Sequence, residues 1–412
     1  MKVLLINKFW YPHGGADIHA IQLAELLKKK DVEVGYFGMH HPDNISIDEI
    51  FTKFFVVQRH NNKAAYETKG KLFTKINEAK RIIYASDAAR NLEKLLQEFK
   101  PDIAHIHNFY HHLSPSIVRI LKKYNIPTVQ TLHDYKRICP NHALFVNNEV
   151  CRKCKTGGYK EAIKNKCIFD ARVPSAVVAT EMYVQKIFGW YDSFDEYIAP
   201  SSFMKQEMVA WGKDENNISV IPNWVLPKKQ QVNKGTDVIF VGGLVKQKGV
   251  DVVLSCARAM PHTTFHLLGT GVEREQIQSE IGMTRLNNVI LHGVKTSSEI
   301  DELYKTCCVT IVPSKLLDNF PNVVLESYAR AVPVIGSIMG GIPEMIEEGQ
   351  TGFVCKTFET HEFVMAIKKA QADTARVMGK NARLIAENRY NPEKIIPRII
   401  ALYQQTIHLK GV

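Results

Sequence analysis

The stretch PSKLLDNFPNVVLE, residues 313–326, carries two carboxylates, Asp318 and Glu326, eight positions apart. An apolar run at 308–313 predicts a buried strand before it, and apolar residues at helical spacing over 323–330 predict a helix after it. The Asn-Phe-Pro-Asn segment is therefore expected to be a strand-to-helix loop. A helix N-terminus binds anions through free N–H groups and the helix dipole, and Glu326, one turn inside, could accept hydrogen bonds from hydroxyls. A sugar nucleotide would offer both phosphate and hydroxyl groups to such a site.

The sequence DNFPNVVLES, followed by AVPVIGSIMGGIPEMI, resembles the acidic-x7-acidic signature and the Gly-Gly-x-Pro-Glu loop of family 4 glycosyltransferases, which are retaining enzymes of the GT-B fold. The first acid of that signature is usually Glu, and here it is Asp318. In the family it lies near the transferred sugar, while the second acid binds the nucleotide ribose and the loop between them contacts phosphate or sugar. The resemblance therefore implies a catalytic role for Asp318, ribose binding by Glu326, and donor contacts by Asn319, Phe320, Pro321, Asn322 and Val323. From the residues alone, the alternative is that Asp318 caps the helix and Glu326 is solvated.

Composition sets broad limits. A chain of 412 residues predicts two or three domains, and 45% apolar with 23% charged residues is ordinary for a globular protein. The net charge of +11 allows nucleic acid, an anionic membrane surface or an anionic substrate as partner. No apolar run approaches the ~18 residues of a membrane span, and no signal-peptide pattern begins the chain, so we expect a cytoplasmic protein. Its eight cysteines are then expected to be thiols or metal ligands rather than disulfides.

The first half of the chain alternates short apolar runs with helical patterns, which predicts a doubly wound parallel sheet. The apolar runs lie at 2–7, 32–37, 54–57, 103–107, 127–132 and 196–199. Ligands of such sheets bind beyond the carboxyl ends of the strands. The loops at these ends contain Gly14-Gly15, His107-Asn108 and His133-Asp134.

Two of these loops resemble loops of the same family. Gly14-Gly15 resembles the family's first loop, which borders the donor phosphates and the acceptor, so the resemblance makes Gly15 a donor-binding candidate. The family commonly has His at the position of His133, close to the donor sugar and the acceptor, which implies that His133 acts beside Asp318 by positioning the sugar. A plain turn at Gly15 and a structural loop histidine at His133 are the alternatives.

Further histidines stand at 105, 107, 111 and 112. Alternation along a strand puts only His105 and His107 on one face. We interpret the group as a wall of the acceptor pocket, with a metal site as the alternative.

Four cysteines lie in a Lys-rich, weakly periodic insertion at about 139–168: Cys139, Cys151, Cys154 and Cys167. The spacings of 11, 2 and 12 intervening residues fit a structural zinc site, in which one metal closes a loop that has little core of its own. Because only one Cys-x-x-Cys is present, reduced free thiols and a redox or iron–sulfur role are alternatives.

A polar, aperiodic segment at 227–235 is expected to link a first domain, 1–226, to a second domain, 236–392, in which the alternation of strands and helices begins again. The stretch FVGGLVKQKG resembles the family's Phe-Val-Gly-Arg-Leu…Glu-Lys-Gly loop, which brings Arg and Lys onto the donor diphosphate. The resemblance places Lys248 and Gly243 at the donor, but Gly243 stands where the family has Arg. Lys246 or a residue of the other domain is a candidate replacement, and an ordinary helix-start lysine is the alternative for Lys248.

Two further segments carry expectations about surfaces. The helical pattern at 395–407 resembles the last helix of the fold, so 393–412 is expected to pack back on the first domain. A basic stretch covers 59–100, and its part at 72–96 has helical period with apolar and basic faces, a pattern that could dock peripherally on an anionic membrane. A solvated helix face is the alternative.

Together these observations predict an α/β protein with two Rossmann-like domains that face a cleft. The resemblance implies a retaining glycosyltransferase that moves a sugar from a nucleotide donor, expected to be a UDP-sugar, to a hydroxyl of a glycan or lipid-linked acceptor, without a catalytic cofactor. The absence of an Asp-x-Asp motif agrees with metal-independent catalysis. A basic, zinc-containing nucleic-acid-binding protein is the alternative from another class, and a sugar-nucleotide epimerase of the same fold is the alternative among enzymes.

Overall fold

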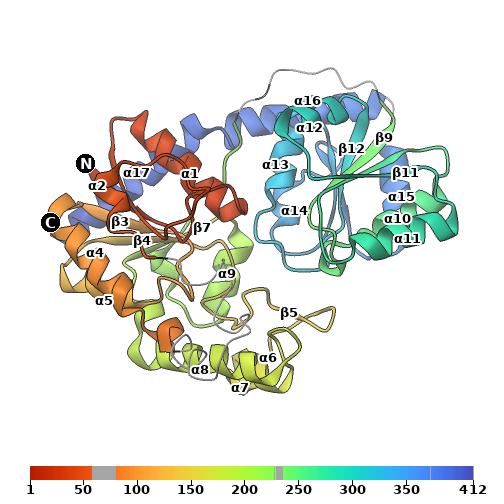
Figure 1. The fold of residues 1–412 in the computed structure, drawn as a ribbon. Helices are drawn as coiled ribbons and strands as arrows, with labels where there is room; N and C mark the ends of the chain where they lie inside the picture. The colour runs from red at the N-terminus through yellow and green to blue at the C-terminus, as the bar shows by residue number, and fades with distance from the viewer. Residues whose placement is uncertain (58–79, 227, 229–234, 372, 412) are drawn as a thin grey trace.

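The computed structural model describes residues 1–57, 80–226, 228, 235–371 and 373–411. These residues form two α/β domains, each built on a six-stranded parallel sheet (Figure 1). The α/β prediction with two Rossmann-like domains is confirmed.

In the first domain the strand order is β2-β1-β3-β4-β7-β8. The strands are β1 (Lys2–Ile6), β2 (Glu33–Phe37), β3 (Ile103–Ile106), β4 (Thr128–Thr131), β7 (Glu196–Ala199) and β8 (Ile218–Val220). The helices between them are α1 (Gly15–Lys28), α2 (Glu49–Thr52), α4 (Ser86–Phe99), α5 (Ser116–Lys123), α8 (Arg172–Phe188) and α9 (Ser202–Ala210). Nearly every residue of the central strands is buried, as expected for a parallel sheet covered by helices on both faces.

In the second domain the order is β11-β10-β9-β12-β13-β14. The strands are β9 (Asp237–Val241), β10 (Phe265–Leu268), β11 (Val289–Gly293), β12 (Cys307–Val312), β13 (Val334–Ser337) and β14 (Gly352–Cys355). The helices are α10 (Val250–Ala259), α11 (Arg274–Thr284), α12 (Ser297–Tyr304), α13 (Asn322–Ala329), α14 (Ile342–Met345), α15 (Thr360–Lys369) and α16 (Asp373–Arg389), with a short 3-10 turn η3 (Lys246–Lys248). The predicted strand-to-helix loop after 313 therefore joins β12 to α13.

The last helix, α17 (Pro392–Leu409), lies against the first domain, next to α1 (Figure 1). Ile395, Ile399 and Tyr403 are buried in the core of the first domain. The Tyr403 hydroxyl lies 2.5 Å from Nδ1 of His105. At the end of α17, Lys410 pairs with Asp195 at 2.8 Å. The chain thus begins and ends in the same domain.

Two local predictions need correction. The apolar run 54–57 is not a strand: only Val56 pairs, in an isolated bridge with Met39, because Phe54 and Phe55 follow α2 directly and are buried in the core instead. The helical pattern at 72–96 falls partly outside the described residues, and within them the helix is interrupted at Tyr84 and Ala85.

The apolar face of α4 is also not free for a membrane. Leu92 and Leu96 are buried, and α4 packs against α5. Within the described residues, no helix combines the length and the apolar character that crossing a bilayer requires. The predicted linker at 227–235 lies almost entirely outside the described residues.

We expect Tyr403→Phe to destabilise the first domain by about 1–3 kcal/mol, because His105 would lose a hydrogen-bond partner in a fully buried position. Urea unfolding followed by tryptophan fluorescence would measure the loss. Tyr36→Phe is a matched control, since the Tyr36 ring is equally a core residue but its hydroxyl makes no hydrogen bond with the described residues. Equal effects of the two substitutions would contradict this account of how α17 is attached.

Candidate active site

The loop between β12 and α13 holds the carboxylate of Asp318 in an ion pair. Nζ of Lys248 lies 2.6 Å from Oδ1 and 2.9 Å from Oδ2 of Asp318, and the Ser314 hydroxyl donates to the same carboxylate. The Asp318 side chain is 12% exposed, so these partners stabilise a charge that is largely shielded from water. Helix α13 begins at Asn322 with Pro321 as its N-cap residue, which shows that Asp318 does not cap the helix.

Lys248 reaches Asp318 because the backbone at Gly249, the next residue, packs closely against the backbone at Pro313, at the end of β12. Gly249 has a φ of +73°, and a Cβ there would lie 2.0 Å from the carbonyl oxygen of Pro313. No larger residue fits without moving one segment. The sequence Lys-Gly of the family loop therefore has a steric reason in this fold: the glycine brings the lysine onto the β12–α13 loop.

A pair of glycines, Gly340 and Gly341, supports the loop from the other side. The N–H of Gly341 donates to the Asp318 carbonyl at 2.7 Å. A Cβ on Gly340 would lie 2.1 Å from the Asp318 carbonyl oxygen, and one on Gly341 would lie 2.0 Å from that of Asn319. The Gly-Gly of the motif GGIPE is thus required by close backbone packing behind the candidate site.

The first domain contacts the same loop. The Tyr135 hydroxyl donates to the Leu317 carbonyl at 2.9 Å, and Nδ2 of Asn319 donates to the Leu132 carbonyl at 2.8 Å. The Ser201 hydroxyl, at the start of α9, donates to Oδ1 of Asn319 at 3.2 Å. Asp318 therefore sits between two residues that are held by the opposite domain.

Glu326 lies on the second turn of α13. Its pKa is raised by burial, and the positive charges of Arg330 and Lys228 oppose this rise. Among the described residues the Glu326 carboxylate has no hydrogen-bond or ion-pair partner, and α13 has no side-chain cap at its N-terminus. A ligand with hydroxyl groups beside Glu326 and an anionic group at the start of α13 would supply hydrogen bonds to the carboxylate and to the helix N–H groups.

The glycine loop of the first domain meets this helix start. Gly14 is the N-cap residue of α1, and a Cβ on Gly15 would lie 3.4 Å from Nδ2 of Asn322. Oδ1 of Asn322 accepts a hydrogen bond from Asn223 at 3.1 Å. The structure thus brings Gly15 and Asn322, which are far apart in the sequence, to one place.

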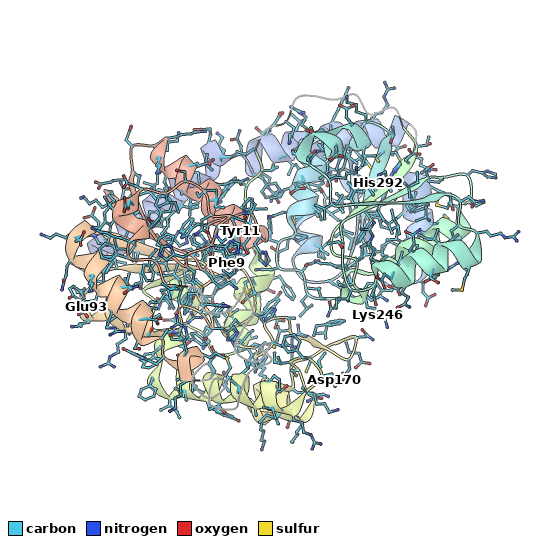
Figure 2. The ribbon with its side chains drawn as sticks, in the orientation of Figure 1. Phe9, Tyr11, Glu93, Asp170, Lys246 and His292 are labelled. Atoms are coloured by element: carbon cyan, nitrogen blue, oxygen red, sulfur yellow. The ribbon has the colours of Figure 1, made fainter. Side chains whose placement is uncertain are left out.

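Of the other residues predicted to bind the donor, Phe320 and Val323 pack inside the second domain, whereas Gly243 is exposed. Phe320 is buried with its ring 5.7 Å from that of Tyr390, so its side chain anchors the loop, and Val323 is partly buried against the same cluster. Gly243 is exposed, and a Cβ there would meet no atom closer than 3.8 Å. Nothing in the fold therefore forbids the family arginine at this position. Lys246 is exposed on the same 3-10 turn as Lys248, at the edge of the second domain (Figure 2).

His133 belongs to a group of three histidines. Its Nε2 lies 2.9 Å from Nδ1 of His107, and His19 of α1 packs edge-on against it, so that one nitrogen of each ring lies within 4.8 Å of the others. Burial lowers the pKa of His133 to about 4 and those of His19 and His107 well below their usual value, so the rings are neutral at neutral pH. Neutral imidazoles can bind sugar hydroxyls, and they are also metal ligands. The Trp224 ring lies against His19, with ring centroids 4.1 Å apart and the planes tilted by 39°.

The interpretation of the remaining histidines as a pocket wall is wrong for His105. Its two ring nitrogens contact Tyr403 and Thr131 in a fully buried position, so His105 is part of the core. His19 was missed by the sequence analysis. Its signal is a polar residue within the apolar face of α1, which periodicity alone assigns to the core.

The four cysteines of the insertion are free thiols, of which Cys139 is buried and the other three are partly buried. They are separate from the loop that carries Asp318. No three of their sulfur atoms lie within 4.8 Å of one another.

Comparison with known proteins gives the family. Residues 13–229 match the family model of Glycosyltransferase Family 4, and residues 223–385 match that of Glycosyl transferases group 1. An uncharacterized glycosyltransferase of Methanocaldococcus jannaschii is 23% identical over 98% of each chain.

Among solved structures, sucrose-phosphate synthase from Thermosynechococcus elongatus has a TM-score of 0.73 at 20% identity, covering 99% of this chain and 100% of that one. Anabaena HepE, solved in complex with UDP-glucose, has a TM-score of 0.65 at 17% identity, covering 98% and 100%. These likenesses agree with the two-domain fold described above. The family 4 model alone covers more than half of the chain, and we conclude that this protein belongs to glycosyltransferase family 4 and has the GT-B fold.

Proposed function

We propose that the protein transfers a sugar from a UDP-sugar to a hydroxyl of a glycan or lipid-linked acceptor in polysaccharide or glycoconjugate synthesis, with retention of configuration. The observation that carries this proposal is the β12–α13 loop. There the Lys248–Asp318 ion pair is followed by the start of α13, which has no side-chain cap, and by the buried Glu326 carboxylate, which has no hydrogen-bond partner among the described residues. The bound UDP-glucose of HepE, a protein of the same fold, supports a UDP-sugar as donor.

In this proposal the donor lies along α13. Its ribose hydroxyls donate to Glu326, and its diphosphate takes the free N–H groups at the helix start. Lys248 stands at the turn that follows β9 and supplies a compact positive charge for the phosphate leaving group. Lys246, on the same turn, is the candidate for the second cation that the family arginine supplies.

The carboxylate of Asp318 would then face the transferred sugar. Lys248 holds it in one orientation, and the contacts from Tyr135 and Asn319 fix the backbone on both sides. A leaving phosphate oxygen can take the acceptor proton on the same face of the sugar, which is why no separate general base is required. The protein's contribution is positioning and charge stabilisation, without a catalytic metal ion.

His133 would complete the sugar site from the first domain. Because burial keeps its pKa near 4, His133 remains an uncharged hydrogen-bonding partner at neutral pH, and its contact with His107 sets the orientation of the ring. For the acceptor side, a lipid-linked substrate would require the enzyme to work at the cytoplasmic face of a membrane. Since the apolar face of α4 is buried, contact with an anionic surface would depend on basic side chains.

Glu326→Ala should raise the UDP dissociation constant at least ~tenfold, about 1.4 kcal/mol, because hydrogen bonds between the carboxylate and the ribose are lost. Isothermal calorimetry would measure it, and Glu326→Gln, which keeps an acceptor oxygen of similar shape, should lose less. An unchanged affinity in the alanine variant would refute the ribose assignment.

Asp318→Asn should lower the turnover number ~10²-fold or more, about 2.7 kcal/mol of transition-state stabilisation, while UDP binds no more weakly than before. The reason is that UDP itself does not reach the sugar position and that Lys248 is released for the phosphates. Steady-state kinetics and calorimetry on the same preparations would separate the two effects.

Asp318→Glu is the control for this substitution, because it restores the carboxylate that the family usually has. It should retain more activity than the asparagine variant. If Asp318→Asn lost UDP binding and turnover to the same extent, Asp318 would be a support of the loop, and its assignment to the sugar would have to be withdrawn.

A further inference from the structure

A cavity of about 550 Å³ lies between α8, α6 (Lys153–Gly157) and the end of α9. Its volume falls within the range of small-molecule binding sites. Trp211 and Lys213 line it just after α9, whereas Ser201, at the other end of that helix, contacts the loop that carries Asp318. Because α9 has 9 residues and spans about 13 Å, the cavity is separate from the candidate active site.

The charged groups that line this cavity favour an anion. Four of them are basic, Arg137, Lys155, Lys186 and Lys213, and one is acidic, Asp192. Asp192 pairs with Lys213 and lies 3.5 Å from Nη2 of Arg137, whereas Lys155 and Lys186 are exposed and form no ion pair with any residue that the structure describes. Burial lowers the pKa of Lys213, and the positive charges of Arg137 and Lys186 add to this effect while Asp192 opposes it. An oxyanion among these cations would reduce their mutual repulsion.

The wall of the cavity also contains buried polar atoms that lack partners. Gln185 of α8 is 1% exposed, and neither its amide oxygen nor its amide nitrogen has a hydrogen-bond partner among the described residues. The same is true of Nε1 of Trp211 within that part of the chain. A buried amide without hydrogen bonds is costly. Independently of the lysines, these atoms therefore indicate a polar ligand.

Helix α8 also exposes an apolar face, in contrast to α4, whose apolar face is buried. Ile187 and Val173 are 78% and 76% exposed, and the exposed ring of Phe188 stacks on that of Trp190 with centroids 4.8 Å apart. At about 100° per residue, these positions lie opposite the side of α8 that is buried in the protein. The exposed side includes Val173, Val177, Thr180, Val184, Ile187 and Phe188, none of which is charged.

This face and the cavity are neighbours on one helix. Tyr183 and Lys186 line the cavity, and Ile187 and Phe188 directly follow Lys186. The Tyr183 hydroxyl accepts a hydrogen bond from the N–H of Lys160, at the start of α7 (Lys160–Lys164), which packs against α8 at the lower edge of the first domain (Figure 1). Between residues 152 and 188, eight Lys or Arg residues stand against three Asp or Glu. An apolar helix face within a basic surface fits an anionic bilayer.

We propose that the cavity beside α8 binds the phosphate group of an anionic membrane lipid, and that the exposed face of α8 lies in the bilayer surface around it. Lys155 and Lys186 contact the phosphate, and the Gln185 amide supplies hydrogen bonds to the headgroup. Ile187 and Phe188 contact the apolar part of the lipid. This attachment goes beyond the proposed transfer reaction, because it assigns a membrane site that is separate from the donor site.

Sedimentation of the full chain with lipid vesicles tests the site. We expect binding to vesicles of phosphatidylcholine mixed with phosphatidylglycerol, little binding to pure phosphatidylcholine, and weaker binding at high salt. Lys155→Gln/Lys186→Gln should bind at least about tenfold more weakly, since each lysine near an anionic surface contributes roughly fivefold in affinity. Ile187→Ser should also weaken binding, because less apolar surface then enters the bilayer.

Two substitutions in the second domain are matched controls. Lys368→Gln removes an exposed lysine of α15, and Met283→Ser removes an exposed apolar side chain of α11. Both variants should bind the mixed vesicles as wild type does. All of these side chains are exposed, so each variant should also keep the wild-type melting temperature.

Three results would overturn the proposal. The first is that wild type does not bind the mixed vesicles, or that the lysine and Ile187 variants bind them equally well. The second is calorimetric binding of inorganic phosphate or a sugar phosphate without vesicle binding, which would assign the cavity to a soluble ligand. The third is self-association that Ile187→Ser abolishes, again without vesicle binding, which would make the face a contact between copies of the chain. The vesicle assay contains no sugar nucleotide, so its failure would leave the proposed transfer reaction unaffected.

Discussion

The ion pair between Lys248 and Asp318 is the interaction on which the arrangement of the site depends. A carboxylate that is only 12% exposed is costly unless it is paired, and its cation must come from a different βα unit of the same sheet. That requirement explains the surrounding glycines. Gly249 brings the Lys248 turn onto Pro313, and Gly340 and Gly341 allow a second loop to pack behind Asp318. Three segments thus meet at one carboxylate.

Contacts from the first domain also hold the loop that carries Asp318. Leu317 and Asn319, on either side of Asp318, contact Tyr135, Leu132 and Ser201 of the first domain. Glu344, four residues after Gly340, accepts a hydrogen bond from the Ser202 N–H at 2.8 Å and another from that of Phe203, at the N-terminus of α9. A carboxylate at this end of a helix is favoured by the helix dipole. The motif GGIPE therefore has two physical tasks: its glycines support Asp318, and its glutamate attaches the second domain to the first.

Sequence patterns were sufficient to predict the two Rossmann-like domains and the loop that carries Asp318. The reason is that apolar runs and glycine motifs are local signals. The patterns failed where a residue type that is typical of a strand or of a binding site is instead buried as part of the core. Phe54 and Phe55 are apolar because they fill the core after α2, and His105 lies on a strand but faces Tyr403, which is 298 positions away. Contacts between residues so far apart in the sequence, such as that of Tyr135 with Leu317, produce no periodic pattern from which they could be predicted. His19 shows the opposite case, in which a functional candidate occupies a position that periodicity assigns to the core.

The central claim is that this constellation transfers sugar from a UDP-linked donor. The most direct measurement is mass spectrometry of a panel of nucleotide sugars incubated with the protein and with glycan and lipid-linked acceptors. The account predicts that one UDP-sugar is consumed with release of UDP and with a matching mass increase of one acceptor. Conversion of a nucleotide sugar into an isomer without release of the nucleotide and without any glycosylated acceptor would contradict it, and would indicate an epimerase built on the same fold.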